Sequence, residues 1–276
     1  MDIKLIAMDL DGTALQKDHM SFSARLTAAL EEAHRQGVII TPVTGRQFGL
    51  LPPPLKAQPV WRDLVVLCNG GRICRLETGE SLYDLNIPQS ALQQLLALSE
   101  DLDIPLEFSR SSRLHLTQRS YDAQLPVENL RFHVHTILAD CGVIVEDLSA
   151  VLEEGCVEKA QLPYIPRHLR DAVEQRLKDI DVSAVWASGS SMEITHNDAT
   201  KGNGLMQVCR LRDVPVKNVM ALGDSGNDVS MLRLAGLGVA MGNAPELVRA
   251  AADAVVESNE DDGAAKAIER FVLNKA

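Results

Sequence analysis

Short apolar runs, each followed by a polar turn, recur near both ends of the chain. Such runs are typical of strands that are buried on both faces of a parallel sheet. They lie at residues 3–8, 38–43, 64–68, 219–222, 237–241 and 253–256. Between them, apolar residues at helical spacing predict helices, one of which begins after Ser23 and ends at Gly37. Strands that alternate with helices in this way predict an α/β fold with parallel strands.

The middle of the chain has a different pattern. Residues 106–117 and 182–195 each fit two strands joined by a polar turn, and helices are predicted to begin at Pro88 and Pro166. Residues 142–155 fit either a strand followed by a helix or one irregular helix. This pattern indicates a smaller α+β domain. We therefore expect a Rossmann-like core built from residues 1–84 and 188–276, with a second domain, residues 85–187, inserted into it.

Composition narrows the range of partners. The 276 residues carry a formal net charge of −11, and only 4% of them are aromatic. With neither a basic stripe nor a stacking platform, binding to nucleic acid or to an anionic membrane surface is not expected. No apolar run approaches the roughly 18 residues that a membrane helix needs. The five cysteines form no CxxC pair and no signal peptide is evident, so we expect a cytoplasmic protein with reduced thiols.

Carboxylates gather where the predicted strands end. The first strand leads directly into Asp9 and Asp11, and buried like charges of this kind need a cation or a shared proton. Ligands of open α/β sheets bind beyond the carboxyl ends of the strands, so these ends should converge on one crevice. Other polar residues at such ends are Thr44, Asn69, Asp224, Asn227 and Asp228. Several carboxylates without a cluster of His or Cys favour Mg²⁺.

Carboxylates, Mg²⁺ and a lysine suit phosphoryl transfer, because its transition state spreads negative charge over the transferred oxygens. One carboxylate can attack phosphorus to give an aspartyl-phosphate. A second carboxylate two residues further on can protonate the leaving oxygen and then activate water. The chain contains neither a G-x-x-x-x-G-K-[ST] loop nor a G-x-S-x-G elbow.

Four motifs together resemble the signature of the haloacid-dehalogenase-like (HAD) phosphohydrolases. In chain order they are D-L-D-G-T at 9–13, V-T-G-R at 43–46, Lys201-Gly202, and G-D-S-G-N-D at 223–228. The long insertion between the second and third motifs resembles the Cof-type subfamily of sugar-phosphate phosphatases. The resemblance spans nearly the whole chain, and four motifs in order are specific where each one alone is weak.

The resemblance implies a role for each motif residue. Asp9 matches the nucleophile and a metal ligand, Asp11 matches the general acid/base whose backbone carbonyl also binds the metal, and Asp224 matches the third Mg²⁺ ligand. Asp228 matches a carboxylate that lies next to the metal ligands and supports them without binding the metal itself. The matched phosphate contacts are Leu10, Thr44, Gly45, Lys201 and Asn227. The implied partner is a small phosphorylated metabolite, and the inserted domain would act as a cap that excludes water and sets specificity.

Simpler roles compete with these. Thr44 could only cap a strand end, and Arg46 could be a surface cation. Asn227 and Asp228 could also cap their helix, which is compatible with a role in the site. We expect an Mg²⁺-dependent phosphatase. The alternatives are a phosphotransferase or phosphomutase that uses the same site, and a non-catalytic sensor of Mg²⁺ and a phospho-metabolite. The oligomeric state is left open.

Overall fold

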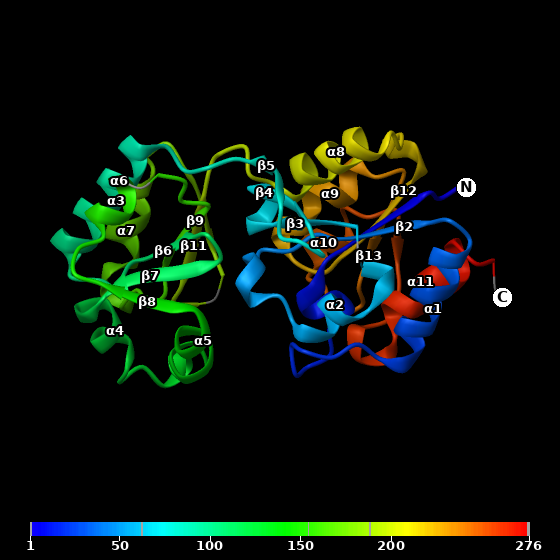
Figure 1. Ribbon diagram of the computed structural model, residues 1–276. Helices are drawn as coiled ribbons and strands as arrows, with labels where there is room; N and C mark the ends of the chain where they lie inside the picture. The colour runs from blue at the N-terminus through cyan, green and yellow to red at the C-terminus, as the bar shows by residue number, and fades with distance from the viewer. Residues whose placement is uncertain (1, 62, 154, 188, 275–276) are drawn as a thin grey trace. The chain divides into compact units, whose positions relative to one another are not determined.

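The computed structural model describes residues 2–61, 63–153, 155–187 and 189–274. By its internal contacts the chain divides into two compact units (Figure 1). The core unit contains Met1–Arg46, Leu51–Tyr83 and Thr200–Ala276, and the inserted unit contains Gln47–Leu50 and Asp84–Ala199.

A five-stranded sheet forms the centre of the core unit. Its order is β14-β13-β12-β1-β2, and every neighbouring pair is parallel. The strands are β1 (Leu5–Met8), β2 (Ile39–Pro42), β12 (Val219–Gly223), β13 (Leu237–Ala240) and β14 (Ala254–Val255). All residues of β1 and β12 are buried, as expected for strands in the interior of a parallel sheet. The predicted parallel α/β core is confirmed.

Helices cover both faces of this sheet. They are α1 (Ala24–Arg35), α2 (Pro53–Ala57), α8 (Lys201–Arg212), α9 (Val229–Leu234), α10 (Glu246–Arg249) and α11 (Gly263–Phe271). Helices α1 and α11 lie side by side, and α8 packs against α9 on the other side of the sheet (Figure 1). The start of α1 is where the sequence predicts it, because Ser23 Oγ accepts a hydrogen bond from the Leu26 N–H at 3.0 Å.

Strand β3 (Leu64–Leu67) departs from the expected parallel order. It pairs antiparallel with β4 (Arg72–Arg75) in a three-stranded sheet that also contains β5 (Ser81–Asp84). A single parallel bridge between Val43 and Val66 links it to the residue after β2. The sequence pattern does not indicate β4 and β5, because both strands mix charged and apolar residues and lack a continuous apolar run.

The inserted unit is built on a six-stranded sheet of order β10-β11-β9-β6-β7-β8. Its strands are β6 (Glu107–Arg110), β7 (Arg113–Thr117), β8 (Gly142–Val145), β9 (Lys159–Leu162), β10 (Ser183–Trp186) and β11 (Met192–Thr195). Its helices are α3 (Gln89–Leu102), α4 (Gln118–Gln124), α5 (Ala139–Cys141), α6 (Ser149–Glu153) and α7 (Arg170–Leu177). Both predicted hairpins, β6–β7 and β10–β11, are confirmed. Residues 142–155 form a strand followed by a helix.

The predicted border between the units needs a correction. Strand β11 pairs with β9, so the inserted unit continues to Ala199 and the core resumes at Thr200. The expected border, residues 187 and 188, divides the second hairpin, and residue 188 itself lies outside the described residues. At the first border the inserted unit begins at Asp84. The segment Gln47–Leu50 also belongs to the inserted unit, which nothing in the sequence pattern indicated.

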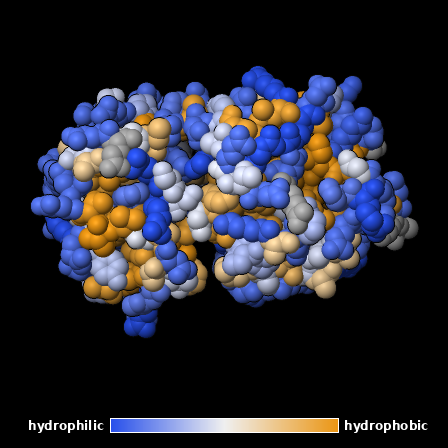
Figure 2. All heavy atoms as spheres, in the orientation of Figure 1, coloured by the Kyte–Doolittle hydropathy of each residue, from blue (hydrophilic) through white to orange (hydrophobic). Residues whose placement is uncertain are grey.

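The face shown in Figure 2 is mainly hydrophilic, with apolar side chains gathered in small areas. This agrees with the acidic composition of the chain. In the described part of the chain, no helix is both long enough and apolar enough to cross a membrane.

Candidate active site

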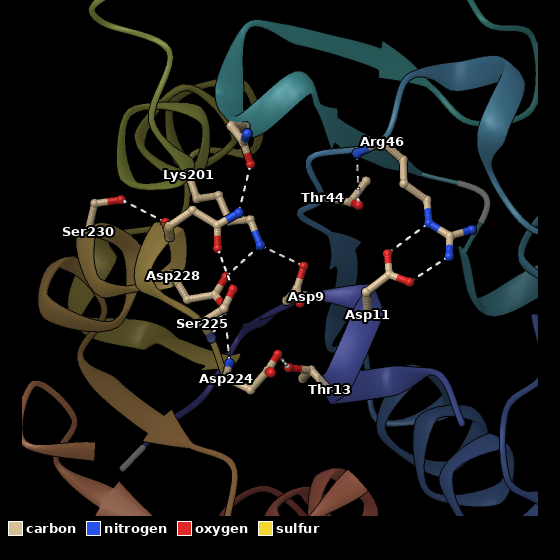
Figure 3. Close-up of polar contacts among 12 residues, drawn as sticks. Asp9, Asp11, Thr13, Thr44, Arg46, Lys201, Asp224, Ser225, Asp228 and Ser230 are labelled. Atoms are coloured by element: carbon tan, nitrogen blue, oxygen red, sulfur yellow. Dashed lines mark hydrogen bonds and ion pairs between the residues drawn. The ribbon is translucent and has the colours of Figure 1, made fainter. Parts of the chain in front are cut away.

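The candidate site lies where three neighbouring strands of the core sheet end. Asp9 follows β1, Thr44 lies two residues after β2, and Asp224 follows β12. The Asp9 N–H donates to the carbonyl oxygen of Leu222 at 3.0 Å, which continues the β1–β12 pairing up to the site. Because these strands are parallel neighbours, their polar ends meet at one edge of the sheet (Figure 3).

Lys201 joins two of the carboxylates. It is the first residue of α8, and its Nζ donates hydrogen bonds of 2.6 Å to Oδ1 of Asp9 and 2.6 Å to Oδ1 of Asp228 (Figure 3). All three side chains are buried. Burial lowers the pKa of Lys201, but the two carboxylates raise it by more, so the net shift is upward and the ammonium stays charged. The structure thus brings together a lysine and two aspartates that are far apart in the sequence.

Asp9, Asp224 and Asp228 form an acidic group in which one oxygen from each side chain lies within 4.8 Å of the others. Burial raises the pKa of Asp9 well above its ordinary value; Lys201 opposes this shift, and Asp228 and Asp224 add to it. Burial and the charge of Asp228 raise the pKa of Asp224 to about 6. One ammonium cannot balance three carboxylates. An all-oxygen donor set with excess negative charge fits Mg²⁺.

Within this group Asp228 holds the loop. Its Oδ2 accepts the backbone N–H groups of Asp224 and Ser225, both at 2.9 Å, while its Oδ1 accepts from Lys201. Both of its oxygens are therefore already engaged. The supporting role of Asp228 and the metal-ligand roles of Asp9 and Asp224 stay predictions.

Close packing fixes Asp224 against the first loop. Gly12 has a φ of 76°, and a Cβ at this position would lie 2.4 Å from Oδ2 of Asp224. The Thr13 hydroxyl donates to Oδ1 of Asp224 at 3.0 Å. Asn243, which follows β13, donates from Nδ2 to the Gly12 carbonyl at 2.9 Å and to Oδ2 of Asp224 at 3.3 Å. Asn243 is not among the residues predicted from the sequence, although its position just after a predicted parallel strand could have indicated it.

Asp11 engages a different partner. Its carboxylate accepts two hydrogen bonds from the guanidinium of Arg46, of 2.8 Å from Nε to Oδ2 and 2.6 Å from Nη2 to Oδ1 (Figure 3). Nδ1 of His19 also lies 2.8 Å from Oδ1. Burial raises the pKa of Asp11, but Arg46 and His19 outweigh burial and lower it overall. The interpretation of Arg46 as a surface cation is therefore wrong, since its side chain is only 18% exposed.

The expected phosphate contacts lie in loops that are tied to one another. Thr44 Oγ1 accepts the Arg46 N–H at 3.1 Å, and the Thr44 carbonyl accepts the Asn69 N–H at 3.0 Å. Asn227 donates from Nδ2 to Oδ1 of Asn69 at 2.9 Å. The hydroxyl of Thr44 therefore does stabilise the turn after the strand, as its simpler role requires. Leu10 and Gly45 lie in the same loops, and the phosphate roles of all these residues stay predictions.

The core has a parallel α/β sheet with acidic side chains and a buried lysine at its strand ends, and a large unit is inserted into it. This combination is typical of a class of phosphatases. A family model for the haloacid dehalogenase-like hydrolases matches residues 6–268, so the chain belongs to this family. It is a phosphatase of the Cof-type branch, as its sequence resemblance predicts.

Relatives and solved structures agree with this assignment. The chain is 38% identical to a phosphoglycolate phosphatase of Methanobrevibacter smithii, over 99% of this chain and 100% of that protein. It is 27% identical to the phosphatase YwpJ of Bacillus subtilis, over 95% and 98% of the two chains. Its fold is similar to that of BT4131, a HAD subclass IIB sugar phosphatase, with a TM-score of 0.81 and 26% identity over 97% and 98% of the two chains.

Proposed function

We propose that this phosphatase depends on Mg²⁺ and hydrolyses a small phosphorylated metabolite through an aspartyl-phosphate formed on Asp9. The observation that carries the proposal is the bridge from Lys201 to Asp9 and Asp228, beside a third carboxylate, Asp224. A buried lysine can balance the nucleophile and the incoming phosphoryl group at the same time.

Asp9 and Asp224 would hold the metal ion together with the backbone carbonyl of Asp11. When bound, the ion supplies positive charge to the transferred phosphoryl oxygens. The fit rests on the donor set, which is all oxygen, and on the raised pKa values of Asp9 and Asp224, which reflect burial and excess negative charge.

In the first step a carboxylate oxygen of Asp9 attacks phosphorus, and the bond from phosphorus to the leaving oxygen breaks. Asp11, in its carboxylic acid form, donates its proton to that oxygen and releases an alcohol. In the second step the Asp11 carboxylate removes a proton from water, whose oxygen attacks the same phosphorus. The bond from phosphorus to Asp9 then breaks, which releases inorganic phosphate and restores both side chains.

The printed names of two relatives support a proposal for the substrate class. BT4131 is a sugar phosphatase, and a Bacillus subtilis relative that is 26% identical over 99% of this chain is a 5-amino-6-(5-phospho-D-ribitylamino)uracil phosphatase. Both names describe a phosphate ester on a carbohydrate or polyol chain. We infer that this enzyme also acts on a sugar phosphate or a related polyol phosphate.

Phosphate release from p-nitrophenyl phosphate tests the proposal. We expect release with Mg²⁺, loss of release in EDTA, and a decrease of about 1000-fold or more in Asp9→Asn, because the amide cannot act as the nucleophile. Asp179→Asn, which changes an exposed aspartate of the inserted unit, is the matched control and should keep full activity.

Asp9→Asn activity close to that of Asp179→Asn would contradict the assignment of the nucleophile. Activity that persists in EDTA would contradict the role of Mg²⁺. Transfer of phosphate to an added sugar, in place of release into water, would favour the phosphotransferase alternative. Binding of phosphorylated metabolites without turnover by the wild type would favour the sensor.

A further inference from the structure

Asn69 lies where the loops after β2, β3 and β12 meet, although none of the four sequence motifs contains it. It lies two residues after β3 in the core unit, and it is only 5% exposed. Its backbone N–H donates to the Thr44 carbonyl at 3.0 Å, and its Oδ1 accepts from Nδ2 of Asn227 at 2.9 Å. Asn69 is therefore bonded to two residues that are expected to contact phosphate.

The backbone of the loop that carries Asn69 has an uncommon conformation. Cys68, Asn69 and Gly70 have φ values of 51°, 56° and 105°, so three consecutive residues lie in the left-handed region. Asparagine is one of the few residues besides glycine that adopt this region readily. A Cβ on Gly70 would lie 2.1 Å from the carbonyl oxygen of Thr200. The loop is thus also packed tightly against the residue that precedes Lys201.

The side-chain amide of Asn227 is held at both ends. Its Oδ1 accepts from Oγ of Ser225 at 2.7 Å, while its Nδ2 donates to Asn69. A hydroxyl can donate or accept, so Ser225 alone does not fix which way the amide points. The acceptor that Asn69 supplies does fix it, and it uses only one of the two hydrogens on Nδ2. An amide turned the other way would present its oxygen, which repels a phosphoryl oxygen.

We propose that Asn69 is a positioning residue of the phosphatase reaction, which orients the amide of Asn227 so that Nδ2 faces the phosphoryl group. Asn69 does not touch the reacting atoms but acts through Asn227, and its backbone N–H holds the neighbouring loop at Thr44. This inference rests on the proposed function, because Asn227 and Thr44 contact phosphate only if the site binds a phosphate ester.

A double-mutant cycle between Asn69 and Asn227 tests the proposal. Asn69→Gly removes the side chain and keeps a residue that adopts the same backbone conformation. Asn227→Ala removes the amide that Asn69 is proposed to orient. The matched control is Asp213→Gly, at an exposed position of the core unit whose φ of 51° is also left-handed. The measurements are kcat and KM for p-nitrophenyl phosphate in Mg²⁺, and the Ki of inorganic phosphate as a competitive inhibitor.

We expect Asn227→Ala to lower kcat/KM by about 10- to 100-fold, as the loss of a hydrogen bond to a charged group does. Asn69→Gly should lower it by about 10-fold, mainly through a higher KM, and should raise the Ki of inorganic phosphate by a similar factor. The double variant should be no slower than Asn227→Ala alone, because Asn69 then has no amide to orient. Asp213→Gly should match the wild type.

A double variant whose loss equals the product of the two single losses would overturn the role of Asn69, because a purely structural defect acts independently of Asn227. Unchanged kinetics of either single variant would overturn it as well. These outcomes leave the proposed function intact. If thermal unfolding shows that Asn69→Gly is not folded, Asn69→Ser, whose side chain is one bond shorter, replaces it in the cycle.

The wild type provides the test that separates this inference from the proposed function. A wild type that releases no phosphate from p-nitrophenyl phosphate in Mg²⁺ would overturn the proposed function, and the role of Asn69 with it. Release by the wild type, together with additive losses in the cycle, would overturn only the role of Asn69.

Discussion

Charge balance around Lys201 is the central feature at the scale of single residues. Three buried or half-buried carboxylates surround one ammonium group, and the pKa values of Asp9 and Asp224 are raised as a result of burial and mutual repulsion. A side chain whose pKa is raised on folding destabilises the folded protein when it is ionised. The carboxylates of the site therefore destabilise the folded protein, and the same excess of negative charge attracts a cation.

Asp224→Asn should stabilise the metal-free protein at neutral pH. The pKa of Asp224 is about 6 in the folded protein, against an ordinary value of 3.8. The penalty from its ionised form is full above about pH 6 and disappears as the pH falls toward 4. We expect a gain on the order of 1 kcal/mol in the free energy of unfolding at pH 7.5 in EDTA, and no gain at pH 4.

Thermal unfolding with and without Mg²⁺ provides the measurement. Mg²⁺ should stabilise the wild type and leave Asp224→Asn nearly unchanged, since the variant lacks one ligand. Asp179→Asn, an exposed control, should behave as the wild type does. A lower melting temperature of Asp224→Asn in EDTA at pH 7.5 would show that the carboxylate stabilises the fold.

At the scale of elements, the position of Lys201 depends on how closely α8 approaches the loop after β3. A Cβ on Gly204 would lie 2.5 Å from Cγ1 of Val66 and 3.0 Å from Cα of Gly70. Gly70 in turn lies against the backbone of Thr200, the residue just before Lys201. Because Gly70 and Gly204 have no side chains, α8 can pack close enough to this loop for Lys201 to lie at the ends of the strands.

Gly204→Ala should distinguish the effect of close packing on the free energy of unfolding from the effect of helix propensity. Alanine in a helix is normally up to about 1 kcal/mol more favourable than glycine. Here we expect a loss of about 1–3 kcal/mol in the free energy of unfolding, because the methyl group has no room, and a lower kcat as Lys201 moves. Denaturant unfolding and steady-state kinetics check this. Asn203→Ala, an exposed position on the same helix, should not be destabilising, and equal stability of the two variants would refute the packing argument.

At the scale of the whole molecule, the proposed metal ligands all belong to the core unit, while most of the polypeptide between the second and third motifs forms the inserted unit. Each unit has its own apolar clusters. A ligand that contacts only one unit should therefore protect that unit selectively.

Hydrogen exchange measures this selectivity. Mg²⁺ with inorganic phosphate should slow exchange in the loops at residues 9–15 and 223–230, and leave the hairpin β10–β11 of the inserted unit unchanged. Asp9→Asn should lose most of the protection in the loops. Equal protection of β10–β11 would mean that the two units respond to the ligand as one body.

The sequence by itself determined most of the core. Apolar runs predicted β1, β2 and β12 because a buried strand needs continuous apolar residues, and Ser23 predicted the start of α1 because its hydroxyl can bond a free N–H. The residue types at the strand ends predicted an acidic site, because carboxylates after a buried strand need a cation. Four local motifs were enough to place Asp9, Asp224 and Lys201 in one family pattern.

Only the tertiary structure decided which distant side chains meet. The fork of Arg46 on Asp11, the bond from Asn243 to Asp224 and the place of Gln47–Leu50 in the inserted unit all depend on contacts between segments remote in sequence. The predicted border between the units wrongly divided the β10–β11 hairpin for the same reason. The pairing of β11 with β9, which is distant in sequence, places β11 in the inserted unit. The local sequence pattern indicates whether a residue is buried and which backbone conformation it prefers. Which distant side chain it contacts depends on how the whole chain folds.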